Sequence, residues 1–567
     1  MAKIANKEIY VADFETSHEE RDGKHYAWVW LAGYQRLFTN RADSLHIQGN
    51  INDFVCSLLQ NETKKVYFHN LKFDGQFLLF YFLMHGYKYN ELLNDKKQMS
   101  YIISEQGAFY KLSVTFVNNA GKLRRCHFID SFKIYPYSLK VLAKQLNLPV
   151  QKGELDHDTV RYPNHTPTEK ELEYFKADIA ILKLGMEVAY EKGFKKLTIG
   201  SNALEKYKET LKIDGKNPKY IFKDLFTPLT KEQDKYLRPF YKGGCCMVRK
   251  DRANLILPCY SFDINSLYPA MMYNKPMPFG RPHMFEGKWV EKEGWVCCQR
   301  LKARFFLKEG FLPSIQLKHT RIFQDNEWIE NSPQQMELFL TNIDLDTFFR
   351  HYDVLDIEWL GGMEFRAKVG FFRQYLDECM FEKENSKDEG TRLFAKLKAN
   401  NIYGKFGTNP DRKSIRYELK DGMIVRSGVV DSECDTIYLP IAIFTTSYAR
   451  HYLLECGQKN YDTFIYCDTD SLHLTEFAKD IPLDDKKMGY FKHEYTGLAK
   501  HIKQKTYIVK IGDEFKITCA GMNKDLLQNE KVELNFETFK LGAMFPKLRA
   551  KRAIGGVFLE HTMHTVK

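Results

Sequence analysis

The sequence of 567 residues lacks the patterns that mark several common protein classes. Its twelve cysteines include the adjacent pairs Cys245-Cys246 and Cys297-Cys298 but no C-x-x-C pair, so neither a zinc ribbon nor a thioredoxin-like site is supported. In a chain this long we expect reduced thiols rather than a disulfide framework. The longest apolar run, Phe77 to Met84, is far shorter than the ~20 residues that span a bilayer. With a polar start to the chain, these absences predict a soluble, intracellular protein.

Repeats, low-complexity tracts and long linkers are also missing, which favours tightly packed domains. The length exceeds that of one hydrophobic core and suggests about three or four domains, and alternating strand and helix patterns predict a mixed α/β architecture. The formal net charge is +11 and aromatic residues make up 14% of the chain. A basic, aromatic-rich chain suits a polyanion whose bases can stack, although a solvated basic surface would give the same numbers.

Two carboxylates lie two residues apart in the segment Tyr466-Cys467-Asp468-Thr469-Asp470-Ser471. The flanking apolar runs, 463–467 and 472–474, predict a β-hairpin with the acids at its turn. In an extended segment Asp468 and Asp470 would face the same side and could bind a divalent cation. A third acid, Asp263, follows an apolar strand. A two-metal site for phosphoryl transfer needs carboxylates from separate strands, and Asp263 with Asp470 would supply them.

A second set of acids lies in the first 200 residues. Asp13 and Glu15 share one face of a predicted strand, and Asp74 follows Asn70 by four residues. A capping-box pattern at Thr168 predicts a helix that would place Tyr174 and Asp178 on one face. The four acids could converge on two metal ions beside a phenol that orients a water molecule. Taken singly, each could equally be a surface or turn residue. The four acids are Asp13, Glu15, Asp74 and Asp178.

Residues 390–403 predict a helix that ends before Gly404. Arg392, Lys396, Asn400 and Tyr403 would form one polar stripe on it. Two cations on such a stripe could hold a triphosphate, whereas an ordinary solvated basic stripe is the alternative interpretation.

The motifs "DINSLYP", "KANNIYGKFG" and "YCDTDS", in this order, resemble motifs A, B and C of family B DNA polymerases. Three amino-terminal stretches, 9–16, 67–75 and 174–178, resemble the Exo I, Exo II and Exo III motifs of DEDDy 3′-5′ exonucleases. The long intervals between motifs, with "NIDLDTFFRHYDV" and "YGKFGTNPD", are similar to the protein-primed polymerases of small Bacillus phages, along essentially the whole chain. The resemblance implies an RNase H-like exonuclease domain and a right-hand polymerase with palm, fingers and thumb and two terminal-protein-region insertions.

The resemblance also implies domain limits and roles for single residues. The expected domains are an exonuclease domain (1–200), palm (201–274 and 439–515), a first insertion (275–371), fingers (372–408), a second insertion (409–438) and a thumb (516–567). Asp263 and Asp470 are the expected polymerisation ligands, with Asp468 in support. Lys152 is expected near the phosphate cleaved in editing, although the sequence alone favours a surface turn lysine. The expected nucleotide-binding residues are Tyr268, which would exclude a 2′-hydroxyl, and Lys383, Arg392, Lys396, Asn400 and Tyr403. The expected DNA-binding residues are Thr16, His69, Asn70, Phe73, Ser131, Tyr241, Gly243, Gly244, Lys505 and Tyr507.

The function implied is that of a replicative, proofreading DNA-directed DNA polymerase of a phage, protein-primed, processive and strand-displacing, in the host cytoplasm. Two Mg²⁺ ions per centre are expected, with Mn²⁺ as a substitute, because oxygen ligands and phosphates suit them. The expected partners are primer-template and single-stranded DNA, deoxynucleoside triphosphates and a terminal protein, bound by a monomer that can form a heterodimer with that protein. The alternatives are a 3′-5′ exonuclease without templated synthesis, a basic DNA-packaging protein and an RNA-directed viral polymerase.

Overall fold

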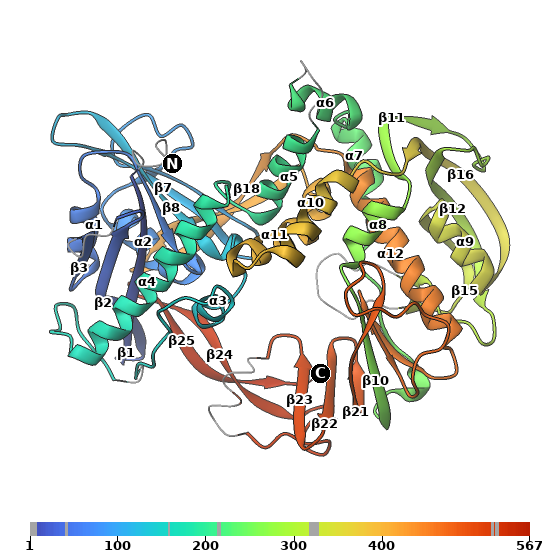
Figure 1. Ribbon diagram of the computed structural model, residues 1–567. Helices are drawn as coiled ribbons and strands as arrows, with labels where there is room; N and C mark the ends of the chain where they lie inside the picture. The colour runs from blue at the N-terminus through green and yellow to red at the C-terminus, as the bar shows by residue number, and fades with distance from the viewer. Residues whose placement is uncertain are drawn as a thin grey trace.

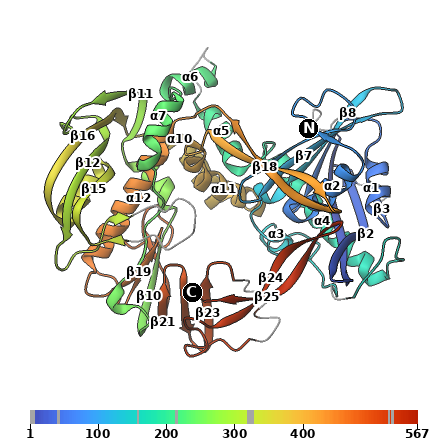
Figure 2. The same cartoon turned by 180° about the vertical axis from the view of Figure 1, so that it is seen from behind.

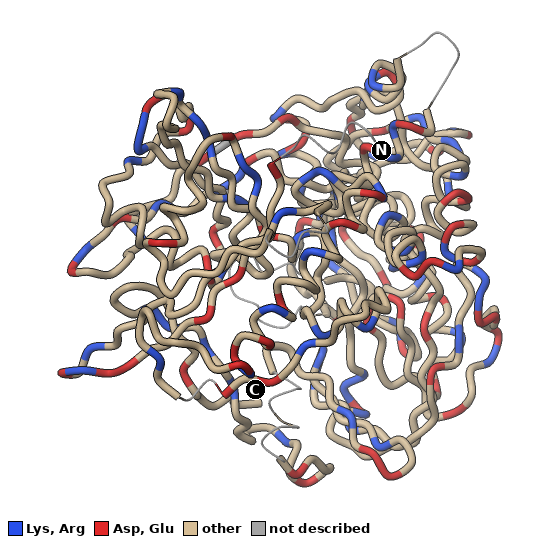
Figure 3. Tube along the Cα trace, turned by 60° about the vertical axis from the view of Figure 1, so that its left-hand side comes forward, with Lys and Arg blue, Asp and Glu red and all other residues tan. Residues whose placement is uncertain are grey.

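The computed structural model describes residues 8–39, 44–156, 159–211, 217–316, 328–522, 527 and 532–566. Two mixed or antiparallel sheets stand at opposite sides of the molecule, and long helices run between them (Figure 1). The view from behind shows the same arrangement, with the amino-terminal sheet now on the right (Figure 2). Basic and acidic residues are interspersed along the chain (Figure 3).

The first sheet contains the amino-terminal acids. Its strand order is β3-β2-β1-β4-β8-β7-β6-β5, in which β1 pairs antiparallel with β2 and parallel with β4. Helices α1 (Ile51–Leu58), α2 (Leu71–Met84), α3 (Leu139–Gln145) and α4 (Glu169–Glu191) belong to the same region. The strands are β1 (Ile9–Arg21), β2 (Lys24–Arg36), β3 (Leu45–Gln48), β4 (Lys64–Phe68), β5 (Lys88–Tyr89), β6 (Gln98–Ile103), β7 (Phe109–Val117) and β8 (Leu123–Asp130).

The second sheet contains the acidic hairpin. Its order is β23-β22-β21-β10-β20-β19-β9, and α8 (Leu267–Asn274) and α12 (Leu439–Lys459) contribute to the same hydrophobic core. The chain therefore brings residue 263 beside residues 468–471 although some 200 positions separate them. The strands are β9 (Cys246–Val248), β10 (Ile256–Ile264), β19 (Phe464–Asp468), β20 (Ser471–Leu474), β21 (Phe491–Lys503), β22 (Thr506–Ile511) and β23 (Glu514–Cys519).

A third sheet, in the order β11-β16-β12-β15, is formed by the segment between α8 and α10 (Arg373–Asn385). It packs with α9 (Asn342–His351). Its strands are β11 (Met277–Phe285), β12 (Trp295–Leu307), β15 (Asn331–Thr341) and β16 (Tyr352–Lys368), beside the short pair β13 (Ile315–Gln316) and β14 (Trp328–Ile329). The central helices are α5 (Ile199–Thr210), α6 (Pro218–Leu225), α7 (Lys231–Leu237), α10 (Arg373–Asn385) and α11 (Glu389–Phe406).

Two hairpins far along the chain complete the core of the first sheet. They are β17–β18 (Asp411–Lys420 and Met423–Glu433) and β24–β25 (Met544–Ala553 and Gly556–Thr565). Tyr417 of the first hairpin and Phe558 of the second are buried in the same apolar cluster as Phe77 of α2. Burial of each aromatic side chain contributes ~2 kcal/mol to the stability of the fold. Both hairpins are therefore anchored to the amino-terminal domain.

Local sequence signals explain several elements. The capping box at Thr168 and Glu171 is present at the start of α4, as predicted. The acidic hairpin also forms as predicted, from β19 and β20. The predicted end of the central helix is wrong, because α11 continues through Gly404 and ends at Gly407, where the ring of Tyr241 fills the place a Cβ would take.

All twelve cysteines lie within the described residues and are free thiols, in agreement with the prediction. In the described part of the chain, none of the helices is long and apolar enough to cross a membrane.

Candidate active sites

Asp263 and Asp470 meet at the end of the second sheet. Asp263 lies opposite Ser471 in the β10–β20 pair, and the N–H of Ile264 donates to the carbonyl of Asp470 at 2.8 Å. Burial, and then the charge of Asp470, raises the pKa of Asp263 to about 7. Burial, with the charge of Asp468 added, raises the pKa of Asp470 to about 6 against the opposing hydrogen bond from its own backbone. Two adjacent carboxylates that resist ionisation form a site that favours a cation.

Asp468 has a different environment from Asp470. The ammonium of Lys505 donates to both of its carboxylate oxygens, at 2.7 and 2.6 Å, and the hydroxyl of Tyr466 donates at 3.2 Å. Thr469 has a positive φ of 62°, so the extended geometry that would put both acids on one side ends at Asp468. The extended geometry assumed for residues 468–470 is therefore absent, although the charge of Asp468 still acts on Asp470, and a supporting role for Asp468 agrees with its ion pair.

Lys505 and Tyr507, both expected to bind DNA, lie in different surroundings. The strand β22 begins at Thr506, and Lys505 precedes it with φ of 55° and pairs with Asp468. The ring of Tyr507 instead packs on Tyr466 and His501, with ring centroids 5.4 and 4.9 Å apart. His501 in turn shares a 2.8 Å hydrogen bond with His473, in a buried pair that the sequence did not single out.

Across from the carboxylates, α10 and α11 present cations and aromatic rings. Burial, and then the positive charge of Lys396, lowers the pKa of Lys383, so these two ammonium groups lie close enough to repel. The rings of Tyr268 and Tyr403 lie 4.2 Å apart between their centroids. Arg392 is exposed and pairs with Glu389 at 2.9 Å, and Asn400 is half-buried on the same helix. Neighbouring lysines beside a carboxylate pair are suited to a polyphosphate bridged by cations.

The loop 241–244 touches the acidic hairpin. A Cβ on Gly244 would meet the hydroxyl oxygen of Thr469 at 2.7 Å, so only glycine fits there, whereas a Cβ on Gly243 would meet nothing within 4 Å. The carbonyl of Cys245 accepts from the N–H of Thr469 at 2.6 Å. The loop therefore supports the turn between Asp468 and Asp470.

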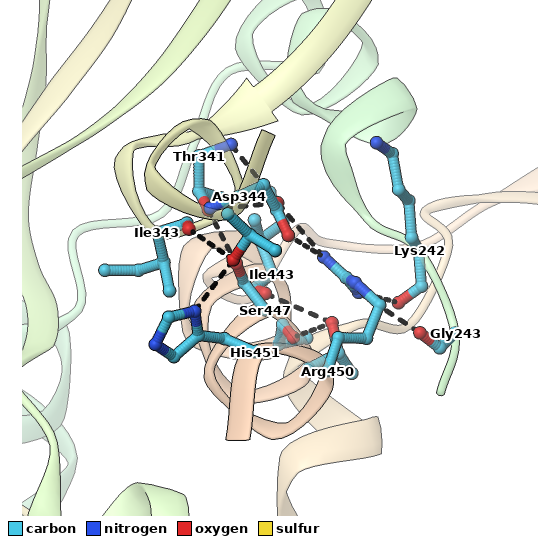
Figure 4. Close-up of polar contacts among 12 residues, drawn as sticks. Lys242, Gly243, Thr341, Ile343, Asp344, Ile443, Ser447, Arg450 and His451 are labelled. Atoms are coloured by element: carbon cyan, nitrogen blue, oxygen red, sulfur yellow. Dashed lines mark hydrogen bonds and ion pairs between the residues drawn. The ribbon is translucent and has the colours of Figure 1, made fainter. Parts of the chain in front are cut away.

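One buried arginine of α12 holds this loop to the third sheet. Arg450 donates to the carbonyls of Lys242 and Gly243 at 3.2 and 3.1 Å and to both carboxylate oxygens of Asp344 at 3.0 and 3.1 Å (Figure 4). Burial opposes ionisation of Asp344, but Arg450 and Lys242 hold its pKa down at about 2. Sequence reasoning missed this pair, and its signal is one arginine at the end of the stretch 439–450, which contains no other charged residue.

The second acidic centre lies in the first sheet. Glu15, Asp74 and Asp178 are buried, and Asp13 beside them is half-buried. Burial, and then the charge of Asp178, raises the pKa of Asp13 to about 7. Burial, and then Asp13, raises the pKa of both Glu15 and Asp74 well above the usual value. Strand β1 and helices α2 and α4 thus bring together the four acids predicted from the sequence.

Lys152 lies directly on this cluster. Its ammonium donates to a carboxylate oxygen of Asp178 and lies 4.9 Å from the ring centroid of Tyr174. Although burial opposes it, Asp178 raises the pKa of Lys152 above its usual value. Burial, and then the Asp178 charge, raises the pKa of Tyr174 to about 12, so its phenol stays protonated at neutral pH. Lys152 is therefore part of the acidic centre and is not a solvated turn residue.

The residues expected to bind a DNA strand differ in exposure, because some reach the surface beside this centre and one is buried below it. Asn70 is exposed, and Thr16 and Phe73 are half-buried. His69 shares hydrogen bonds with Ser131 at 3.0 Å and with the carbonyl of Tyr137 at 2.7 Å. Ser131 is fully buried and its hydroxyl also donates to the carbonyl of Phe68 at 2.9 Å, so it supports His69 from beneath the surface.

Asp130 was missed by the sequence reasoning. Its carboxylate accepts from the N–H groups of Asn70, Leu71 and Phe132 at 3.0, 3.2 and 3.1 Å and so fixes the start of α2. No clear sequence signal marks Asp130, because it ends the strand β8, which contains two arginines and a histidine, and the pairing of β8 with β4 is visible only in the structure.

The residues of both centres fit a divalent cation that substrate helps to bind. Within the described ranges, no group of three or more His, Cys, Asp or Glu side chains is arranged to hold a metal ion by itself. Mg²⁺ is commonly bound by one or two carboxylates, with water and substrate phosphates completing the shell. Paired acids with raised pKa values meet this requirement.

Taken together, a palm-like sheet with an acidic hairpin, a basic helix facing it and a separate acidic domain define a nucleic-acid polymerase with an attached nuclease-type domain. The profile of the family "DNA polymerase type B, organellar and viral" matches residues 55–487. The DNA polymerase of Bacillus phage Nf is 34% identical over 99% of this chain and 100% of its own length.

Solved structures of the phi29 DNA polymerase agree with this match. One is a complex with primer-template DNA (TM-score 0.90, 31% identity), and another is a ternary complex with primer-template DNA and incoming nucleotide substrates (TM-score 0.89, 32% identity). Each alignment covers 99% of this chain and 100% of the other.

The chain therefore belongs to the type B DNA polymerases of organelles and viruses. It is a DNA-directed DNA polymerase of the Bacillus-phage type, as the motifs predicted, and the predicted fold of exonuclease domain, palm, fingers and thumb is confirmed. Polymerases of this family use divalent metal ions.

Proposed function

We propose that the chain extends a DNA primer at Asp263 and Asp470 and trims the same 3′ end at Asp13, Glu15, Asp74 and Asp178. The observation that carries this division is the presence of two carboxylate clusters with raised pKa values in two different sheets. A nuclease without templated synthesis, a DNA-packaging protein or an RNA-directed polymerase would need at most one of them.

In the polymerisation centre, Lys383 of α10 and Lys396 of α11 bind the triphosphate. Arg392, near the start of α11, contributes to the same binding. Tyr268 and Tyr403, whose rings lie 4.2 Å apart, enclose the incoming sugar and base, so a 2′-hydroxyl would clash with Tyr268. Lys505 keeps Asp468 neutralised, which leaves Asp263 and Asp470 as the ion-binding pair. Gly244 keeps the acidic turn in place.

In the editing centre, protonated Tyr174 orients the attacking water by hydrogen bonding, since its raised pKa excludes a role as base. Lys152 lies where it can neutralise a phosphate oxygen once Asp178 has exchanged it for a metal ion. His69, Asn70, Thr16 and Phe73 hold the single-stranded end, with Ser131 positioning His69.

Two Mg²⁺ ions per centre, replaceable by Mn²⁺, would lower the pKa of the attacking hydroxyl or water and neutralise the charge that develops on the phosphate. The ligands would be Asp263 and Asp470 in one centre and the four amino-terminal acids in the other. Their mutual repulsion, relieved by cations, supports this assignment.

DNA and nucleotide binding follow from the phi29 structures, which contain primer-template DNA and incoming nucleotides. The hairpins β17–β18 and β24–β25 also contact the amino-terminal domain and each other, and we propose that they close a ring through which DNA passes. Ile554 of the β24–β25 hairpin pairs with Tyr26, Ser414 of β17 pairs with Ser104, and the Arg552 guanidinium lies 4.9 Å from the ring centroid of Tyr417. Such a ring would keep DNA bound during long, strand-displacing synthesis.

A cavity of about 920 Å³ supports the passage of a strand through this ring. It is lined by the β6–β7 loop, the start of α5, the end of α11 and the start of β17. If a variant lacking residues 409–437 made products as long per binding event as the parent, the ring would have no role in processivity.

The third sheet is the proposed contact for a terminal protein whose side-chain hydroxyl primes synthesis. Exposed apolar side chains on its strands, namely Met284 and Leu355, and Val290 between β11 and β12 support a protein-binding face. A phage polymerase with these partners would act in the host cytoplasm.

One assay tests the proposal. With Mg²⁺, the protein should extend a labelled primer on circular single-stranded DNA and should attach the first deoxynucleotide to a candidate terminal protein. Extension without that attachment would retain the polymerase and remove the protein-primed assignment.

A further inference from the structure

Helix α11 is buried in two different hydrophobic cores. Leu393, Phe394 and Leu397, in its first half, belong to the core of the amino-terminal domain. Ile402 and Phe406, in its second half, belong to the core of the palm. The helix that carries Arg392 and Lys396 is therefore fixed by two domains, and Figure 1 shows it running between them.

The contact with the amino-terminal domain is aromatic and closely packed. Phe394 is 1% exposed, and its ring centroid lies 4.1 Å from that of Phe194 and 5.4 Å from that of Tyr135. Phe394 lies two residues from each of the cations Arg392 and Lys396, so its packing fixes the position of both.

The start of α11 also meets the end of α4. Asp388, the N-cap of α11, accepts from Thr391 and pairs with Lys192, the C-cap of α4, at 2.7 Å. Gly390 has no room for a side chain, because a Cβ there would lie 2.7 Å from a methyl carbon of Val188. A valine on a helix is held in essentially one rotamer, so the relief of this contact must come from separation of the two helices.

We propose that the contact of α11 with α4 and with the segment that follows α4, made by Gly390 on Val188 and by Phe394 on Phe194, positions the triphosphate-binding cations of the fingers. The exonuclease domain thus sets the affinity of the polymerase for the incoming nucleotide, through residues that touch neither substrate. Phe394 and Gly390 are positioning residues in this account. The inference rests on the proposed role of Lys396 in triphosphate binding.

The physical reason is the stiffness of a helix. A shift at Gly390 is transmitted to Arg392 and Lys396 within two turns, since backbone hydrogen bonds keep the rise per residue constant. Displacing a binding group by about 1 Å can cost as much as ~100-fold. Acids of the polymerisation centre lie on the palm sheet and keep their geometry. We therefore expect weaker nucleotide binding with little change in the rate at saturation.

The test uses the full-length protein on a primed template, with KM for the deoxynucleoside triphosphates and kcat measured separately. Gly390→Ala should raise KM about tenfold, with kcat and the degradation of single-stranded DNA within about twofold of the parent. Val188→Ala alone should leave KM within about twofold. The double variant Gly390→Ala/Val188→Ala should return KM to near the parental value, because the added methyl group then has room.

A second pair of variants distinguishes a change in the position of α11 from a general loss of folding. Phe394→Leu should raise KM at least threefold, whereas Phe82→Leu, an equal change in the amino-terminal domain away from α11, should not alter it. Lys396→Ala tests the underlying site separately, and an unchanged KM there would overturn the proposed triphosphate site. If Lys396→Ala raises KM while Gly390→Ala and Phe394→Leu leave it unchanged, or if the double variant is not rescued, the positioning role is wrong.

Discussion

The proposed editing and polymerisation centres both contain carboxylates that repel one another. They differ in which acid pairs with a lysine. In both, buried carboxylates repel one another and one acid is paired with an ammonium group. In the polymerisation centre, Lys505 pairs with Asp468, which is not a proposed metal ligand. In the editing centre, Lys152 pairs with Asp178, which is one.

The two centres differ in whether an ammonium group lies on an acid that would bind a metal ion. Asp263 and Asp470 are left without a lysine partner among the described contacts and can accept an ion as the nucleotide arrives. An ion bound by Asp178 would have to displace the Lys152 ammonium. The proposed editing centre would therefore need a side-chain rearrangement that the proposed polymerisation centre would not need.

The largest effect should come from removing metal ions. Chelation should lower both primer extension and single-strand degradation by more than about 1000-fold, because no other group on either cluster stabilises the developing charge as strongly. Both rates are measured on one end-labelled primer, before and after Mg²⁺ is restored. Degradation that persisted in chelator would contradict a metal site among the four amino-terminal acids.

The two lysines provide a sharper comparison. Lys152→Gln should lower degradation about 10- to 100-fold and leave extension unchanged, whereas Lys505→Gln should lower extension about tenfold and leave degradation unchanged. Lys302→Gln, which removes an exposed ion pair with Glu358, is the matched control. If each lysine affected both activities equally, the centres would not be independent.

The pH dependence of stability should reveal the carboxylate clusters in the metal-free protein. Asp13 and Asp263 have a folded pKa of about 7 against 3.8 for the ordinary group, so the folded state binds more protons between these values. Its stability from these groups is present at pH 4 and is lost as pH rises to 7, by no more than about 1.4 kcal/mol per pH unit and carboxyl.

Buried histidines act in the opposite direction, so the measurement is a difference. The pKa of His127 and His473 is lowered to about 4 by burial, which favours the folded state as pH rises. Asp13→Asn/Asp263→Asn should therefore match the parent in thermal unfolding at about pH 4 and exceed it at pH 8 in chelator. A parent protein more stable than the variant at pH 8 would show that the acids do not repel.

The smallest effect concerns two neighbouring glycines. Gly244→Ala should lower the melting temperature by a few degrees and reduce extension, since the new methyl group meets Thr469. Gly243→Ala adds a methyl group in open space and should leave the melting temperature unchanged. Equal melting temperatures for the two variants would remove the proposed support of the acidic turn.

Much of this structure could be predicted from local patterns. The hairpin at residues 463–474, the capped helix α4 and the strand before Asp263 follow from alternation and capping, which are local properties. The ion pairs of Asp178 and Asp468 depend on distant lysines, and no spacing rule identifies Lys152 or Lys505 as partners. Helix α11 has its C-cap at Gly407, where the ring of Tyr241 leaves no room for a side chain, and this distant contact could not be predicted from the nearer Gly404.

The central claim is that one chain holds two separate catalytic centres. The direct test is a single labelled primer-template assayed for extension and degradation with Asp470→Ala and with Asp13→Ala. Asp470→Ala should lose extension and keep single-strand degradation, and Asp13→Ala should do the reverse. Loss of both activities in each variant, or of neither, would contradict the assignment of two independent centres.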